Sequence, residues 1–300
     1  MNDVHTGLPK FDYIKPSTIK EASNFIIDHK EESRPFLGGT VVFVHMRDGI
    51  WKEKYLIDIK HLEGMKDISF DQKEGLTVGA AVTLNQIAEN PDIIKHYPLL
   101  VDAANKVGNY QLRNRATIGG SICNSRPDSD IVTACLPYNA ILRIYGEKEE
   151  FETPLSKFFL SLGKGILKPG ELLMKIKFPI PPSRSVGKFI KLGRNRVGDR
   201  AIVGVAVLGY PDQRVPSGFT FRLAIASAGP VPLIPEEAVQ ILQSSKLDEG
   251  IIEKASNAAM EAATPMDDTR ASAQYRKWMV RNLTRKALLE VVEHLKGLKI

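Results

Sequence analysis

The stretch that decides the fold is Arg113-Asn114-Arg115-Ala116-Thr117-Ile118-Gly119-Gly120-Ser121, in which two adjacent glycines lie between hydroxyl-bearing residues. An earlier stretch, Pro35-Phe36-Leu37-Gly38-Gly39-Thr40-Val41, also has a glycine pair followed by a hydroxyl residue. Glycine has no Cβ and tolerates positive φ, so it lets backbone N–H groups come close to phosphate oxygens. Either stretch alone is typical of a tight turn, whereas the two together predict one diphosphate site that is wrapped from both sides.

Neither glycine stretch belongs to the common nucleotide-binding motifs. The dinucleotide fingerprint needs G-x-G-x-x-G, and the phosphate loop of nucleoside triphosphatases ends in G-K followed by Ser or Thr. Both spacings are missing from the two stretches. The sequence therefore gives no support to a Rossmann domain or a phosphate-loop domain.

The composition is that of an ordinary globular protein. The 300 residues are 43% apolar and 25% charged, which disfavours disorder, and the length suggests two domains. The net charge of +6 is modest and the charges are interleaved, so nucleic-acid binding is disfavoured. One basic group is expected to form a solvated helix face: Arg276, Lys277, Arg281, Arg285 and Lys286.

Cysteine usage and hydropathy suggest where the protein works. Cys123 and Cys135 are too few for an iron–sulfur cluster, which usually needs four thiolates, and both are expected to be reduced core residues. No metal site is predicted. The N-terminal residues contain no apolar signal segment, and no run of 18 apolar residues predicts a membrane span. We therefore expect a cytoplasmic location.

Hydrophobic periodicity and capping signals place the secondary structure. Strands are expected over residues 11–16, 34–37, 55–59, 68–70, 75–79, 140–145, 172–178, 186–192, 201–208 and 220–225. Helices are expected from a cap at Ser17 or Thr18 to Ile27, and over 84–89, 97–107, 130–138, 236–243, 247–262 and 271–295. Residues 41–46 fit a helix or a strand, and a helix is favoured because they follow a glycine stretch. Residues 111–121, dense in polar groups and glycine, are expected to form a loop.

A proline cluster at residues 179–182 is the best linker candidate. It divides the chain into residues 1–182, with mixed elements and both glycine stretches, and residues 183–300, with three longer strands followed by helices. Strands followed by helices in one block favour an α+β arrangement, in which a sheet is backed by a helical bundle.

Several segments, in this order, resemble the FAD-binding subunits of the xanthine dehydrogenase and carbon monoxide dehydrogenase group of molybdenum hydroxylases. They are residues 37–40, 56–59, 78–84, 111–122 and 268–276, and together they extend over essentially the whole chain. The resemblance implies a two-lobed FAD domain of the vanillyl-alcohol-oxidase/MurB type, followed by a small C-terminal domain of sheet and helices. It also implies FAD as the cofactor, and non-covalent binding is expected because no histidine lies in either glycine stretch.

The resemblance further implies which residues contact FAD. Segment 35–41 would wrap the pyrophosphate, Asp130 would hold a ribose or ribityl hydroxyl, and Lys191 would lie near the isoalloxazine ring. Asp130 is alternatively a helix N-cap, and Lys191 a strand residue that reaches solvent. The full expected set is Pro35, Phe36, Leu37, Gly38, Gly39, Thr40, Val41, Thr117, Gly119, Gly120, Ser121, Asn124, Asp130, Leu172, Leu173 and Lys191. Ile176 is a further candidate for packing near the flavin, and no acid–base catalytic residue is expected.

The function implied by the resemblance is that of an electron-transfer subunit. A partner large subunit would carry the molybdopterin cofactor, a partner small subunit would carry 2Fe-2S clusters, and this chain would pass electrons through FAD to NAD, a quinone or another acceptor. The alternative is a stand-alone FAD-dependent oxidoreductase with a small substrate bound over the flavin. The small size expected for residues 183–300 disfavours that alternative, and the segment 268–276 argues against a MurB-like NADPH reductase.

Overall fold

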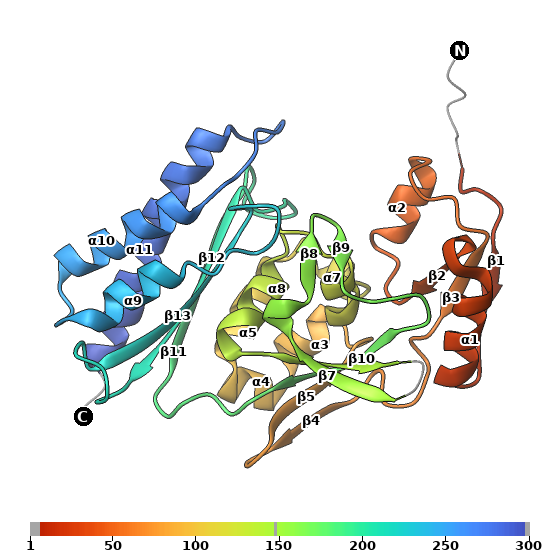
Figure 1. Cartoon of the computed structure of the whole chain (residues 1–300), viewed down its shortest axis with the longest axis horizontal. Coiled ribbons are helices and arrows are strands. Elements are labelled where there is room, and N and C mark those ends of the chain that lie inside the picture. The colour runs from red at the N-terminus through yellow and green to blue at the C-terminus, as the bar shows by residue number, and fades with distance from the viewer. Residues whose placement is uncertain (1–6, 147–148, 298–300) are drawn as a thin grey trace.

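The computed structural model describes residues 7–146 and 149–297. Figure 1 shows an N-terminal lobe at one end, a central lobe built on a larger sheet, and a C-terminal layer of sheet and helices at the other end. The arrangement is α+β, as predicted.

The first lobe is a three-stranded parallel sheet in the order β1-β3-β2. Its elements are β1 (Asp12–Ile14), α1 (Ile19–His29), the 3-10 turn η1 (Lys30–Glu32), β2 (Ser33–Phe36), α2 (Val42–Arg47) and β3 (Tyr55–Asp58). The predicted cap of α1 forms, since Thr18 Oγ1 accepts the Glu21 N–H at 3.1 Å. The Glu21 carboxylate accepts the N–H of Ser17, so the return bond lies one residue earlier than in a capping box.

The central lobe is a five-stranded antiparallel sheet in the order β4-β5-β10-β6-β7. Its strands are β4 (Ile68–Asp71), β5 (Gly75–Gly79), β6 (Ile141–Tyr145), β7 (Glu150–Pro154) and β10 (Leu172–Phe178), with a small hairpin of β8 (Phe159–Ser161) and β9 (Lys164–Gly165). Its helical elements are α3 (Leu84–Glu89), α4 (Pro91–His96), α5 (Pro98–Lys106), α6 (Tyr110–Arg113), α7 (Ile118–Cys123), α8 (Asp130–Cys135), η2 (Leu136–Tyr138) and η3 (Leu155–Lys157). Apolar side chains between this sheet and its helices form one continuous core.

The prediction of a loop over residues 111–121 is wrong, because this segment holds α6 and the start of α7. Both helices are short, and each begins with a polar cap. Asn109 Oδ1 accepts the N–H of Leu112 at 2.8 Å, and Thr117 Oγ1 accepts the N–H of Gly120 at 3.1 Å. Ile118 and Ile122 are fully buried, so tertiary packing holds α7 helical despite its two glycines.

The C-terminal layer is a three-stranded antiparallel sheet backed by three helices. Its elements are β11 (Val186–Leu192), β12 (Val203–Pro211), β13 (Phe219–Ala226), α9 (Glu236–Ser244), α10 (Glu249–Ala262) and α11 (Ala273–Gly297). Along β12, Val205 and Val207 pack with the core beneath the helices, whereas Ala206 and Leu208 pack with the core of the central lobe. The sheet is therefore buried on both faces, which explains the continuous apolar pattern of this strand.

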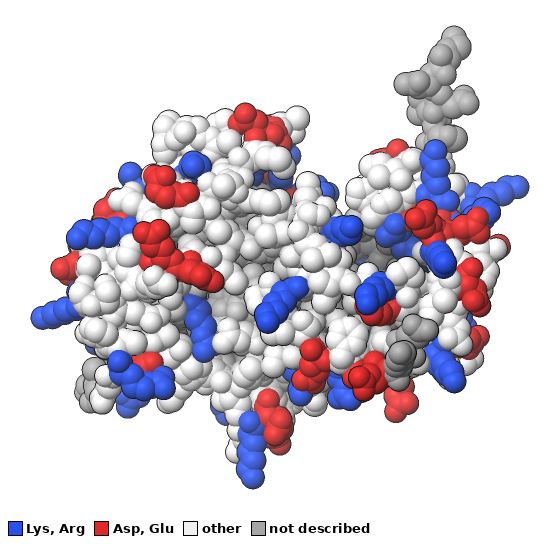
Figure 2. All heavy atoms as spheres, in the orientation of Figure 1, with Lys and Arg blue, Asp and Glu red and all other residues white. Residues whose placement is uncertain are grey.

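The surface has no region dominated by one sign of charge on the face drawn in Figure 2, where basic and acidic side chains are interspersed. Two of the five basic residues expected on a solvated face of α11 form ion pairs with α10: Arg281 and Arg285 both pair with Glu253. A third, Arg276, is only 3% exposed, so its assignment to a solvated face is wrong. Among residues 7–146 and 149–297, no helix has the length and hydropathy needed to cross a membrane.

Candidate cofactor site

The first glycine stretch forms the turn between β2 and α2. Phe36 ends β2 opposite Asp58 of β3, and Gly39 has a φ of +75°, which favours glycine. No protein acceptor is found, within the described residues, for the backbone N–H groups of Gly38, Gly39, Thr40 and Val41. A row of such donors suits an anion with several acceptor oxygens, as a diphosphate has.

The two glycine stretches lie against each other. A Cβ built on Gly38 would lie 1.9 Å from the carbonyl oxygen of Arg115, which is two residues before Thr117. Such a distance is impossible for a real side chain, so only glycine allows the turn after β2 to pack on the backbone that leads into α7. The two stretches are therefore adjacent in the fold, as a single site formed by both of them requires.

The second glycine stretch is the first turn of α7. Its N–H groups already have protein acceptors: Ile118 N–H donates to Val82 O, Gly119 N–H to Ala80 O, and Ser121 N–H to Thr117 O. A Cβ on Gly119 would lie 2.5 Å from Cβ of Ala80, so this glycine serves close packing. The second stretch thus offers the partly buried side chain of Ser121 and a packing surface, whereas the free backbone donors come from the first stretch.

Asn124 and the two leucines occupy different surroundings. Asn124 is the C-cap of α7 and is partly buried. Leu172 and Leu173 lie on β10 and are 2% and 3% exposed, and Ile176 on the same strand is fully buried. The side chains of all three β10 residues therefore present almost no surface to a ligand.

Asp130 and Lys191 form a buried ion pair. Lys191 Nζ lies 2.6 Å from Asp130 Oδ2, and the side chains are 9% and 5% exposed. The same ammonium donates to the carbonyl oxygens of Lys106, at 3.0 Å, and Asp199, at 2.7 Å. Lys191 therefore does not reach into solvent, and Asp130 does not cap α8, whose N-cap is Ser129.

One oxygen of Asp130 has no partner. Its Oδ1 is buried and accepts no hydrogen bond from the described residues. A buried carboxylate oxygen without a donor is costly, and a hydroxyl group of a bound ligand would satisfy it. Together with the free N–H groups of the first stretch, this orphaned oxygen fits a ligand that carries both a diphosphate and sugar-type hydroxyls.

A side-chain cluster behind the first stretch was missed by the sequence interpretation. Asp58 accepts hydrogen bonds from the Tyr13 hydroxyl, at 2.5 Å, and from Lys60 Nζ, at 2.6 Å. Lys60 Nζ also lies 4.8 Å from the ring centroid of Phe36. The sequence did contain a signal for this cluster: the charged Asp58 follows the apolar residues Leu56 and Ile57 in a strand, and a buried carboxylate needs partners.

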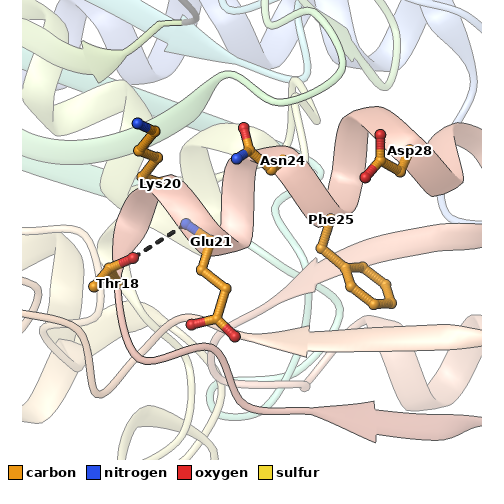
Figure 3. Close-up of a pocket in the computed structure, with 6 residues that line it drawn as sticks. All are labelled: Thr18, Lys20, Glu21, Asn24, Phe25 and Asp28. Atoms are coloured by element: carbon orange, nitrogen blue, oxygen red, sulfur yellow. Dashed lines mark hydrogen bonds between the residues drawn. The ribbon is translucent and has the colours of Figure 1, made fainter.

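A shallow hollow of about 450 Å³ lies along α1, apart from the glycine stretches. Figure 3 shows its lining residues, which come from one helix and its cap: Thr18, Lys20, Glu21, Asn24, Phe25 and Asp28. None of them belongs to the expected cofactor set. Within the described part of the chain, no group of three or more His, Cys, Asp and Glu residues is arranged to hold a metal ion.

The pH dependence of stability provides a first test of the buried pair. Burial raises the pKa of Asp130 to about 7, and the effect of burial exceeds the lowering by Lys191. The other charged groups that act on it are Asp128 and Lys106. Because the pKa is raised on folding, the stabilisation that Asp130 contributes at low pH is lost as the pH rises from about 4 to about 7.

We expect Asp130→Asn, which cannot ionise, to gain stability relative to the wild type across that window, by about 1.4 kcal/mol per pH unit. The measurement is urea unfolding of the full chain without FAD at several pH values. Asp71→Asn is the matched control, because the exposed carboxyl of Asp71 has a lowered pKa. The stability difference between this variant and the wild type should therefore not rise with pH. Parallel pH profiles for Asp130→Asn and the wild type would contradict a raised pKa.

Comparison with known proteins identifies the two parts of the chain. Residues 9–181 match the family model described as the FAD binding domain in molybdopterin dehydrogenase. Residues 188–291 match the model described as the CO dehydrogenase flavoprotein C-terminal domain.

The chain is also similar to individual proteins along nearly its whole length. It is 28% identical to a putative xanthine dehydrogenase FAD-binding subunit of Escherichia coli (strain K12), over 93% of this chain and 95% of that protein. It is 27% identical to the carbon monoxide dehydrogenase medium chain of Hydrogenophaga pseudoflava, over 93% and 96%. A solved carbon monoxide dehydrogenase from Hydrogenophaga pseudoflava, lacking the Mo-pyranopterin moiety of its cofactor, contains a chain that superposes with a TM-score of 0.91 at 25% identity, covering 96% of this chain and 99% of that one.

Proposed function

Because this chain belongs to the family of FAD-binding domains of molybdopterin dehydrogenases, we propose that it is the FAD-binding electron-transfer subunit of a molybdenum hydroxylase complex. Electrons reach it from iron–sulfur clusters on a partner and leave toward an external acceptor. FAD, when bound, supplies the redox chemistry, because a flavin exchanges electrons both singly and in pairs. The residues of this chain bind the cofactor, orient it and tune it.

The observations that carry the proposal are the row of unpaired N–H groups at Gly38–Val41 and the orphaned Oδ1 of Asp130, among the described residues. The first feature matches the pyrophosphate of FAD and the second matches a ribose or ribityl hydroxyl. The remaining members of the proposed contact set are Pro35, Phe36, Leu37, Thr117, Gly119, Gly120, Ser121, Asn124 and Lys191. Leu172 and Leu173 are proposed to take part through their backbone, because their side chains are almost fully buried.

Lys191 has a distinct role in this proposal. Its ammonium is held by Asp130 and by two carbonyl oxygens, so its position is fixed. A fixed cation near the isoalloxazine ring stabilises negative charge on the reduced flavin and raises the reduction potential. No side chain of this chain is assigned an acid–base step.

The partners follow from the chemistry that this chain lacks. Its two cysteines cannot supply the four thiolates that an iron–sulfur cluster usually needs. A large subunit with the molybdenum cofactor and a small subunit with 2Fe-2S clusters would provide the missing centres. The relatives are named as a subunit and a medium chain, which supports a multi-chain complex. The acceptor is NAD, a quinone or another carrier.

Residues 1–182 then form the FAD-binding domain and residues 183–300 the C-terminal domain. The two family models, which end at residue 181 and begin at residue 188, support this division. Both cysteines are unpaired, which supports a reducing, cytoplasmic location.

Purification of the chain from its native source tests the proposal. We expect a visible flavin spectrum, an FAD content of about one per chain, and co-purification with two further chains that carry iron–sulfur and molybdenum. A flavin spectrum without partner chains would instead indicate a stand-alone oxidoreductase. A complex in which this chain holds no flavin would show that the proposal is wrong.

A further inference from the structure

An ionic cluster, in which Arg276 is buried, Arg270 partly buried and Asp268 exposed, lies where the segment before α11 meets the C-terminal sheet. Asp268 accepts hydrogen bonds from Arg270 Nη2, at 2.8 Å, and from Arg276 Nη2, at 2.6 Å. It also accepts the backbone N–H groups of Arg270 and Ala271. These bonds hold the pKa of Asp268 well below its usual range, so the cluster is ionised. In the sequence, Asp268 and Arg270 served only the family resemblance, and Arg276 was wrongly expected on a solvated helix face.

The cluster reaches across to the loop that precedes α8. Arg270 Nη1 lies 3.5 Å from Asp128 Oδ2 and 3.3 Å from Ala201 O. Asp128 is buried, and the guanidinium of Arg126 also holds it, at 3.1 Å. Ser227 reinforces this junction, because its N–H donates to Pro127 O at 2.8 Å. The loop at residues 126–129 is thus fastened to the C-terminal layer.

The same cluster also holds residues 199–202, which contact the Lys191 side of the buried Asp130–Lys191 pair. Arg276 Nη1 donates to Ile202 O at 2.6 Å, and Ile202 N–H donates to Leu192 O at 2.7 Å. The carbonyl oxygen of Asp199, three residues before Ile202, accepts a hydrogen bond from Lys191 Nζ. Arg270 therefore holds the loop that ends at Asp130, while Arg276 holds the backbone beside Lys191.

We propose that Asp268, Arg270 and Arg276 are positioning residues for the flavin site, and that they set the geometry of Asp130 and Lys191 from the C-terminal layer. The inference rests on the proposed function, because it concerns the same cofactor site. The proposal assigns no contact with FAD to Asp268, Arg270 or Arg276.

The energetics favour positioning over simple stabilisation. Arg276 is 3% exposed, and its Nε has no hydrogen-bond partner among the described residues. Well-packed apolar residues often stabilise a fold at least as well as buried ions do. The ionic cluster instead orients its neighbours, because a planar guanidinium holds its carboxylate and carbonyl partners at defined angles.

The test is FAD titration of the full chain carrying Arg270→Ala or Arg270→Lys. We expect Arg270→Ala to raise the FAD dissociation constant by about 10-fold, by analogy with the loss of outer hydrogen-bonding partners at metal sites. FAD affinity is expected to change near neutral pH as Asp130 ionises. In Arg270→Ala the midpoint of this change should move to lower pH, because a released loop lets water reach Asp130 and lowers its pKa. Arg270→Lys keeps the charge and should restore part of both properties.

Arg285→Ala is the matched control, because it removes an arginine that pairs with Glu253 on the outer helical layer. It should leave both the dissociation constant and the pH midpoint unchanged. If Arg270→Ala does not fold, Asp128→Ala removes the carboxylate that Arg270 contacts. This variant is judged by the FAD dissociation constant alone, because Asp128 also acts directly on the pKa of Asp130.

The outcomes separate this inference from the proposed function. Unchanged affinity and pH midpoint in the folded Arg270→Ala chain, or unchanged affinity in Asp128→Ala if that replaces it, would overturn the positioning role while leaving FAD binding intact. Equal losses in Arg285→Ala would also overturn it, because the effect would then reflect general destabilisation. Failure of the wild-type chain to bind FAD would overturn the proposed function first.

Discussion

Replacing Gly38 by alanine is expected to abolish FAD binding and to lower the free energy of unfolding by about 3 kcal/mol. The new Cβ would lie 1.9 Å from the carbonyl oxygen of Arg115 and 2.8 Å from its carbonyl carbon. Both atoms belong to the backbone, so no rotamer change relieves the overlap. The turn after β2 must then move away from the start of α7, and the row of N–H groups at residues 38–41 moves with it. Flavin fluorescence titration and urea unfolding measure the two effects.

Gly229→Ala is the control for this substitution. A Cβ on Gly229 would have Thr264 Oγ1 as its nearest neighbour, at 3.4 Å, which is an ordinary contact. Its backbone has no positive φ, so alanine there should be neutral or stabilise slightly by restricting the unfolded chain. Wild-type FAD affinity in Gly38→Ala would contradict the view that close packing of the two stretches builds the site.

Much of the fold was predictable because its signals are local. The Thr83 cap of α3 is a complete capping box with Gln86, and the strand predicted over residues 172–178 agrees with β10 at both ends. The hairpin of β4 and β5 follows from a polar turn between two apolar runs. In these elements local propensity and tertiary packing favour the same conformation.

The errors arose where local and tertiary signals differ. Gly119 and Gly120 suggest a loop, yet α7 is held helical by the burial of Ile118 and Ile122. The helix α4 was not predicted, although Asn90 caps it and Pro91 occupies its first turn, a pattern typical of helix starts. Asparagine and proline together were equally compatible with a turn.

The candidate site was predictable only in part, for the same reason. Glycine pairs indicate close backbone approach, but the sequence does not say what approaches. The contact between Gly38 and Arg115, and the pairing of Asp130 with Lys191, join residues far apart in the chain. Both residues of the ion pair were placed near the cofactor through the family resemblance, whereas their mutual contact was not predicted.

The second large effect is expected from Lys191→Met. This change leaves Asp130 buried without its cation, and removal of one partner of a buried pair typically costs about 3–5 kcal/mol. Above pH 7, where the Asp130 carboxyl of the wild type is ionised, the free energy of unfolding should fall by up to that amount. The loss is limited because removal of Lys191 raises the pKa of Asp130 further, so the carboxyl can take up a proton. In the chain with bound FAD, loss of the cation should also weaken cofactor binding and lower the reduction potential of the flavin. Urea unfolding and spectroelectrochemistry measure these changes.

Lys188→Met is the control, because Lys188 lies on the same strand and its Nζ forms a more exposed ion pair with Glu290 at 2.8 Å. Such a pair contributes about 0–1 kcal/mol, so this variant should stay close to the wild type in stability, affinity and potential. The double variant Lys191→Met with Asp130→Asn should recover much of the lost stability, since no unpaired buried charge remains, while the potential should stay low. A potential unchanged in Lys191→Met would mean that this cation does not act on the flavin, even if the stability loss appears as expected. The two measurements therefore distinguish a lysine that only satisfies Asp130 from one that also tunes the cofactor.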